Sequence, residues 1–120
     1  MEAPTEIRLS KDKRTLTVVF PDASHAFSAE MMRVMSPSAE VQGHSPSERK
    51  IIGGKRDVAI MTIVPVGNYA IRVAFDDMHD TGIFTWAWFR EHGQAMEEKW
   101  QAYLDELAAR GLSREPRRRT

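Results

Sequence analysis

The densest group of polar side chains is Asp76-Asp77-Met78-His79-Asp80, with three carboxylates and one imidazole in five residues. Histidine and aspartate are good ligands for zinc, iron or manganese, so His79 with Asp76, Asp77 or Asp80, and His44 from the preceding loop, can form a divalent-metal site. The alternative is a polar turn between strands, with aspartate side chains accepting hydrogen bonds from backbone N–H groups. Because the sequence supplies no second ligand cluster, the turn is the favoured interpretation.

Arg33 is the one charged residue in the apolar run Met31–Met35. An arginine there can anchor an anion or a carboxylate through bidentate hydrogen bonds. The favoured alternative is a solvent-facing position, with the aliphatic stem lying along apolar surface. The neighbouring Met31, Met32 and Met35 are interpreted as core residues.

The sequence offers little else for catalysis. It has no cysteine, which excludes thiolate zinc sites, cysteine-ligated clusters and a cysteine nucleophile. Gly53-Gly54-Lys55 lacks the upstream glycine and the following Ser or Thr of a phosphate-binding loop. No Gly-x-Ser-x-Gly motif is present. We therefore expect no intrinsic enzymatic activity.

Composition indicates one small domain of 120 residues. Lys plus Arg and Asp plus Glu both number 17, so nucleic acid is not an expected partner. No export signal is visible at the N-terminus, and no apolar run approaches the roughly 20 residues of a membrane span. We expect a cytoplasmic protein without membrane contact.

Short strands are predicted over the first 85 residues. Alternating apolar residues predict a hairpin of Glu6–Leu9 and Thr15–Phe20, followed by a strand near His25–Phe27. The nearly continuous apolar run Val58–Val64 predicts a central strand covered on both faces. It pairs in our interpretation with Tyr69–Phe75, in which Tyr69 shares the apolar face. A brief strand at Ile83–Thr85 follows.

Helices are expected at Ala29–Met35 with Ser28 as N-cap, at Trp86–His92 with Thr85 as N-cap, and at Gln94–Arg110 with Gly111 after its end. The segment Gln42–Arg56 is interpreted as a long surface loop. The fold class is therefore α+β, a small mainly antiparallel sheet with two short helices and a C-terminal amphipathic helix.

The C-terminal helix carries apolar side chains at helical spacing, among them Trp100, Tyr103, Leu104 and Leu107. That face can pack on the sheet or meet a second copy of the chain, and the sequence does not choose between them. The basic residues 112–120 are expected to be a disordered tail.

Two segments together are similar to a known family. Met32-Arg33-Val34-Met35-Ser36-Pro37-Ser38-Ala39-Glu40-Val41-Gln42-Gly43-His44 is the first, and the second runs from Pro65 through Asp76-Asp77-Met78-His79-Asp80 to Trp86. Both resemble the DUF971 domain, which is itself similar to the N-terminal domain of gamma-butyrobetaine hydroxylase. The resemblance covers residues 5–93, leaving 94–111 as an added helix and 112–120 as the tail.

In the hydroxylases this domain binds zinc through three cysteines and one histidine, as the resemblance implies. His79 matches the histidine, whereas Ser36, Ser38 and Val41 stand at the cysteine positions. Serine hydroxyls are poor replacements for thiolates, so no cofactor is expected, although a divalent metal at His79 stays open. The catalytic domain of the hydroxylases has no counterpart here.

The leading hypothesis is therefore a non-catalytic adaptor that binds another protein. Related domains occur fused to P-loop ATPases that resemble iron–sulfur cluster carriers, which implies a role accessory to the assembly of iron–sulfur or other metalloproteins. The resemblance brings two segments together at one zinc, and this predicts a partner surface made of Arg33, Ser36, Pro37, Ser38, Asp77, His79 and Trp86. The alternative is a metal-binding module centred on His79, with Asp77 and Asp80. A homodimer through the C-terminal helix is a further possibility.

Overall fold

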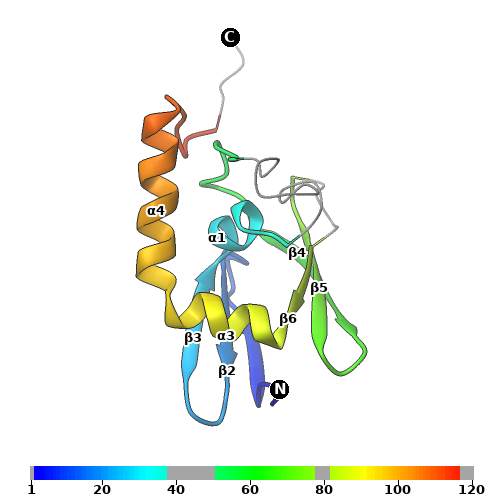
Figure 1. Cartoon of the computed structure of the whole chain (residues 1–120). Helices are drawn as coiled ribbons and strands as arrows, with labels where there is room; N and C mark the ends of the chain where they lie inside the picture. Colours follow the sequence, from blue (N-terminus) through cyan, green and yellow to red (C-terminus); the bar gives the residue numbers. More distant parts are fainter. Residues whose placement is uncertain (1, 38–50, 78–81, 117–120) are drawn as a thin grey trace.

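The computed structural model describes residues 2–37, 51–77 and 82–116. Its strands form two three-stranded antiparallel sheets, which we call sheet A and sheet B (Figure 1). Sheet A has the order β1-β2-β3, from Glu6–Leu9, Thr15–Val19 and Ser24–Ser28. Sheet B has the order β4-β5-β6, from Ile60–Val66, Ala70–Phe75 and Gly82–Thr85. The predicted α+β class is confirmed, with two small sheets in place of one.

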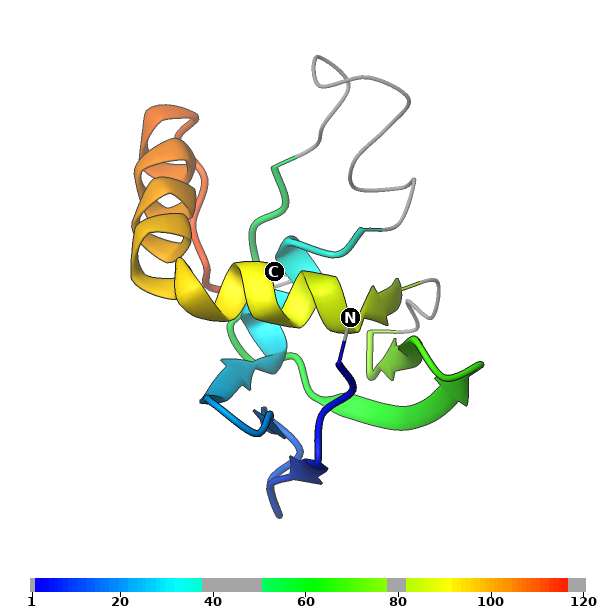
Figure 2. The same ribbon diagram turned by 60° about the horizontal axis from the view of Figure 1, so that its bottom comes forward.

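Three helices are described: α1 at Ala29–Val34, α3 at Trp86–Gln94 and α4 at Met96–Ala109. Both predicted N-caps are confirmed, because Ser28 Oγ accepts a hydrogen bond from Met31 N at 3.0 Å and Thr85 Oγ1 accepts one from Trp88 N at 3.0 Å. Helix α3 leads from β6 to α4 and crosses the molecule at a steep angle to α4 (Figure 2). Gly111 follows α4 with φ +67°, the left-handed conformation that favours glycine after a helix end.

The core lies between the inner faces of the two sheets and is closed by α1 and α3. Alternation along each strand turns every second side chain inward. The inner face of sheet A supplies Leu16, Val18 and Phe27, and sheet B supplies Ile71, Val73, Phe75 and Phe84. Met31 and Met32 from α1 join them at 2% and 0% exposure, which confirms their predicted place in the core.

The apolar run Val58–Val64 does not form the predicted central strand. The strand is β4, two residues later, and it lies at the edge of sheet B. Met61 and Val64 are 52% and 46% exposed, so β4 is covered on one face only. Tyr69 also differs from the prediction, since it precedes β5 in the turn and is 53% exposed. Long apolar runs are typical of strands buried on both faces. The prediction was wrong because some apolar residues of β4 point outward to solvent.

The apolar face of α4 packs on α1 and on the segment 51–52, and its Met96 and Trp100 pack against the main core. Tyr103 and Leu107 are buried against Val34, and Tyr103 donates a 2.6 Å hydrogen bond to the carbonyl of Ile52. The chain after α4 departs from the predicted disorder as far as residue 116. Ser113 and Arg114 accept backbone hydrogen bonds from Gly54 and Arg56; residues 117–120 lie outside the described part.

Within the described residues, no helix combines the length and the apolar character needed to cross a membrane.

Candidate functional site

Helix α1 carries two buried charges, and each is paired with a distant segment. Arg33 Nε donates to Asp77 Oδ2 at 2.8 Å, and Lys55 Nζ lies 2.6 Å from the same oxygen. On the same helix, Glu30 is 4% exposed and receives a bidentate pair of hydrogen bonds from Arg114, at 2.8 and 2.6 Å. Buried charges are tolerated when they are paired in this way. The short helix is therefore held by ion pairs at both ends.

Asp77 is ionised in this arrangement. Burial by itself raises the pKa of Asp77, but hydrogen bonds from Lys55 and Arg33 outweigh burial and hold the pKa below its ordinary value of 3.8. Among the polar atoms of Arg33, Nη1 is buried and has no hydrogen-bond partner in the described part of the chain. The cluster thus brings two cations to one carboxylate and, among the described residues, leaves one buried donor unsatisfied.

Arg33 is not the solvent-facing residue that the sequence favoured. Its side chain is 10% exposed and anchors a carboxylate, which is the alternative interpretation of the sequence. The carboxylate belongs to the chain itself, to Asp77 in the acidic turn. Long-range pairing of this kind leaves no trace in the local helical pattern.

The remaining residues of the predicted partner surface do not share one exposed patch. Ser36 is fully buried and its Oγ lies 3.1 Å from the point where a side chain on Gly82 would begin. This contact brings the two family segments together, as expected. Pro37 is exposed, whereas Trp86 lies at the far end of β6, where its Nε1 donates to the Asn68 carbonyl at 2.9 Å. Ser38, Val41, His44, His79 and Asp80 lie outside the described residues.

A zinc ion of the kind that the resemblance implies does not fit the donor atoms of the described residues. The position of one cysteine is taken by the buried hydroxyl of Ser36, and Val41 offers no donor atom. The two described carboxylates of the acidic turn are already engaged. Asp77 pairs with Arg33 and Lys55, and Asp76 Oδ1 accepts a hydrogen bond from Ala59 N at 3.0 Å. Across the described ranges, no group of three His, Asp or Glu side chains is placed to hold a metal.

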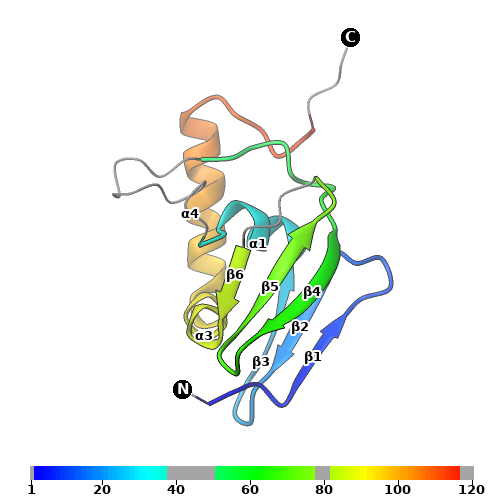
Figure 3. The ribbon, with the colours of Figure 1, turned by 90° about the vertical axis from the view of Figure 1, so that its right-hand side faces the viewer.

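The outer face of sheet B exposes apolar side chains. We define it as Thr62, Val64 and Val66 of β4, Arg72 and Ala74 of β5, and Ile83 of β6. No described helix or strand lies over this face (Figure 3). Antiparallel sheets with one solvated face normally alternate apolar-in with polar-out. Here Val64 and Ile83 point outward and are 46% and 40% exposed.

One cation stands at the centre of this face. Arg72 lies on β5, the central strand of sheet B. It pairs with Val64 of β4 on one side and with Ile83 of β6 on the other. Arg72 is exposed and, within the described ranges, has no ion-pair partner. Side chains of directly paired residues on neighbouring strands lie about 5 Å apart. The Arg72 side chain is therefore flanked by the aliphatic side chains of Val64 and Ile83. An exposed apolar patch with a polar contact point is typical of a protein-binding surface.

Sequence reasoning missed this surface, although two signals for it were present. The apolar run Val58–Val64 contains more apolar residues than a one-sided strand needs, and Arg72 interrupts the outward set of the next strand. Together these signals indicate an apolar outer face with a central charge. The apolar run alone predicts burial on both faces, because the strand order is not readable from a single sequence.

Comparison with known proteins places the chain in a family. Residues 7–90 match the family model described as gamma-butyrobetaine hydroxylase-like, N-terminal. Two solution structures determined by NMR are 41% and 36% identical, with TM-scores of 0.84 and 0.82. Both alignments span 100% of this chain, and they span 95% and 90% of those proteins.

A third similar structure is a crystal structure of a protein of unknown function from Acidithiobacillus ferrooxidans, which belongs to the DUF971 family. It is 36% identical, with a TM-score of 0.61, over 73% of this chain and 89% of that protein. No curated protein matches the chain. The match over most of its length shows that this chain belongs to the gamma-butyrobetaine hydroxylase-like N-terminal (DUF971) family.

Proposed function

We propose that this chain is a non-catalytic binding module that docks another protein on the outer face of sheet B. The observation that carries the proposal is the row Val64, Arg72 and Ile83, in which two exposed aliphatic side chains flank a cation without an ion-pair partner in the described ranges. Arginine surrounded by apolar residues is enriched among the side chains that dominate binding energy in protein interfaces.

The charge of Arg72 specifies the chemistry of the partner. A complementary surface presents a carboxylate to Arg72 and apolar side chains to Val64 and Ile83. A second copy of this chain fits less well, because a two-fold axis through the face brings two Arg72 guanidinium groups together. The occupant is therefore a different protein with an acidic residue inside an apolar patch.

The biological setting follows from the family resemblance. Domains related to this one occur fused to P-loop ATPases that resemble iron–sulfur cluster carriers, and this favours a role accessory to the assembly of iron–sulfur or other metalloproteins. Because the chain has no cysteine, that role is docking and not cluster binding. A cytoplasmic location and the absence of intrinsic catalysis belong to the same proposal.

The metal-binding alternative at His79 stays a prediction with a simple test. The engagement of Asp77 by Arg33 and Lys55 supports the turn interpretation over a metal site. Metal analysis of the full chain after mild purification decides between them. Zinc, iron or manganese at near-stoichiometric amounts supports the alternative, and their absence ends it.

The test of the docking proposal is affinity capture of the tagged chain from a lysate of its own source. Arg72→Glu is the test variant, and Arg8→Glu is the matched control, because Arg8 occupies an exposed outer position on sheet A. We expect a near-stoichiometric partner with the wild type and the control, and its loss with Arg72→Glu.

Charge reversal in the captured partner then identifies the contact. Replacing the partner's carboxylate by lysine is expected to restore binding to Arg72→Glu, because the two charges are exchanged across the interface. Equal capture by the wild type, Arg72→Glu and Arg8→Glu contradicts docking on this face. The absence of any partner for folded wild-type protein contradicts the adaptor proposal as a whole.

A further inference from the structure

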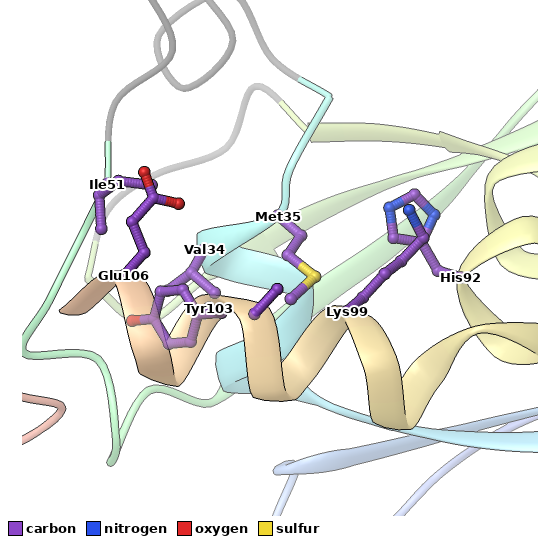
Figure 4. Close-up of a pocket in the computed structure, with 8 residues that line it drawn as sticks. Val34, Met35, Ile51, His92, Lys99, Tyr103 and Glu106 are labelled. Carbon is purple, nitrogen blue, oxygen red and sulfur yellow. The ribbon is translucent and has the colours of Figure 1, made fainter. Parts of the chain in front are cut away.

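A groove lies between α4 and the end of α1, on a different side of the molecule from the outer face of sheet B. Its volume is about 270 Å³, just below the range of pockets for drug-sized ligands, which favours a smaller molecule. Val34 of α1 and Met35, which follows that helix, face Tyr103 of α4 across it, and Ile51 borders it (Figure 4).

The middle of the groove is apolar. Val34 is buried, and Met35 is half-buried beside it. Tyr103 contributes its ring and no free hydroxyl, because that hydroxyl donates to the Ile52 carbonyl at 2.6 Å. Burial raises the pKa of Tyr103 to about 12, so the phenol stays neutral. The middle thus suits hydrocarbon and offers no charge.

The two ends of the groove differ in charge. Lys99 and His92 lie at one end, and Glu106 lies at the other beside Ile51 (Figure 4). Lys99, Tyr103 and Glu106 follow one face of α4, which separates the two ends by about 10 Å at 1.5 Å per residue. Glu106 pairs with Arg110 at 3.3 Å, one turn farther along.

Lys99 is only loosely engaged by the protein. The nearest carboxylate, Glu91 Oε1, is 3.9 Å away, and that side chain is 70% exposed. An exposed pair at this distance contributes little, so the ammonium keeps donors for a ligand. Beside it, burial lowers the pKa of the His92 imidazole and outweighs the 2.9 Å hydrogen bond from Nδ1 to the Trp88 carbonyl, which raises that pKa.

We propose that this groove binds a small aliphatic monocarboxylate, with the carboxylate at Lys99 and the hydrocarbon chain along Met35, Val34 and Tyr103. The far end disfavours a second carboxylate, because it would meet Glu106. The site is independent of the proposed docking face, since the two share no residue.

The test is titration of the full chain with hexanoate, followed by ¹H–¹⁵N NMR. Hexanamide and hexylammonium serve as control probes with a similar hydrocarbon chain. Hexanamide carries no charge, and hexylammonium carries a positive charge. We expect saturable shifts confined to α4, Val34, Met35 and Ile51 with hexanoate. The other two probes should bind at least tenfold more weakly, because they lose one charge-assisted contact.

Two variants complete the test. Lys99→Gln is expected to weaken hexanoate binding at least tenfold, and Lys11→Gln, at an exposed lysine in the β1–β2 turn, is expected to leave it unchanged. The amide spectrum of each variant reports its folding. Equal binding of all three probes, equal binding by Lys99→Gln and wild type, or no saturable shift with hexanoate overturns the proposal.

Discussion

The two sheets of this protein share one construction and differ in their outer faces. Each has three antiparallel strands and turns one apolar face to the common core. The central outward row of sheet A is Arg8, Thr17 and Ala26, and the corresponding row of sheet B is Val64, Arg72 and Ile83. Arg8 pairs with Glu6 at 3.0 Å, whereas Arg72 has no ion-pair partner in the described ranges.

The difference separates what the fold requires from what it does not. Both inner faces are needed to form the core, but a polar outer face is sufficient for folding, as sheet A demonstrates. The apolar outer residues of sheet B are therefore an addition that folding does not explain. A binding surface explains them, since contact with a partner removes the exposed apolar area from water.

The largest expected effect on stability comes from substitutions in the core that the two sheets share. Phe27→Ala in sheet A and Phe75→Ala in sheet B each remove a fully buried ring from the core. We expect each to lower the free energy of unfolding by about 3 to 5 kcal/mol, from lost burial and the cavity left behind. Urea unfolding measures both, and a clear inequality between them would show that the core depends mainly on one sheet.

The next effect concerns the anchor of sheet B on α1. Asp77→Asn leaves Arg33 and Lys55 without their carboxylate, and we expect a loss of about 2 to 3 kcal/mol, reduced from the range for fully buried pairs because Asp77 is partly exposed. Arg8→Ala breaks the exposed pair on sheet A and should cost less than about 0.5 kcal/mol. Similar losses in both variants would contradict the assigned role of Asp77.

The same carboxylate gives a pH dependence. The pKa of Asp77 is lower in the folded protein than its ordinary value of 3.8, so the unfolded chain takes up its proton first as the pH falls. Its contribution to stability is complete above the unfolded pKa and is lost as the pH falls through the folded pKa. Thermal unfolding between pH 5 and pH 2 should show a steeper loss for the wild type than for Asp77→Asn. Parallel curves would contradict this.

A change that completes the apolar face should promote self-association. Arg72→Leu removes the only charge among the six residues of the outer face of sheet B, and joins Val64 to Ile83. Sedimentation velocity is expected to detect larger species for this variant and not for Arg8→Leu on sheet A. Identical sedimentation profiles for the two variants would indicate that the outer faces of the two sheets do not differ in their tendency to self-associate.

The smallest effect on stability is expected for substitutions that change the outer face of sheet B without disturbing the core. Val64→Thr and Ile83→Thr keep β-branched side chains at exposed positions of sheet B. Each should change the free energy of unfolding by no more than about 0.5 kcal/mol, while weakening capture of the partner. A loss of several kcal/mol would show that these side chains serve the fold.

The sequence predicted the local elements well because local rules determine them. Ser28 and Thr85 cap their helices as expected, and Gly111 follows α4 in the left-handed conformation. The amphipathic face of α4 was also predicted, and the structure shows that it packs on α1 and on the segment 51–52. Capping and periodicity depend on residues within a few positions, so a single sequence contains them.

The candidate site was beyond such rules because it depends on strand order and distant pairs. Arg33 pairs with Asp77, which is 44 positions later in the sequence, and Glu30 pairs with Arg114, which is 84 positions later. Nothing near Arg33 or Glu30 in the sequence indicates these partners. The apolar β4 could be recognised as an edge strand only once its neighbours in sheet B were known.

The most direct measurement of the central claim is photo-crosslinking in cells from one position on each outer face. A benzophenone amino acid replaces Ile83 on sheet B or Ala26 on sheet A, two exposed positions at the ends of the corresponding rows. We predict one discrete adduct with another protein from position 83 and none from position 26. Adducts of equal yield from both positions, or an adduct only with a second copy of this chain, would contradict a docking surface on sheet B.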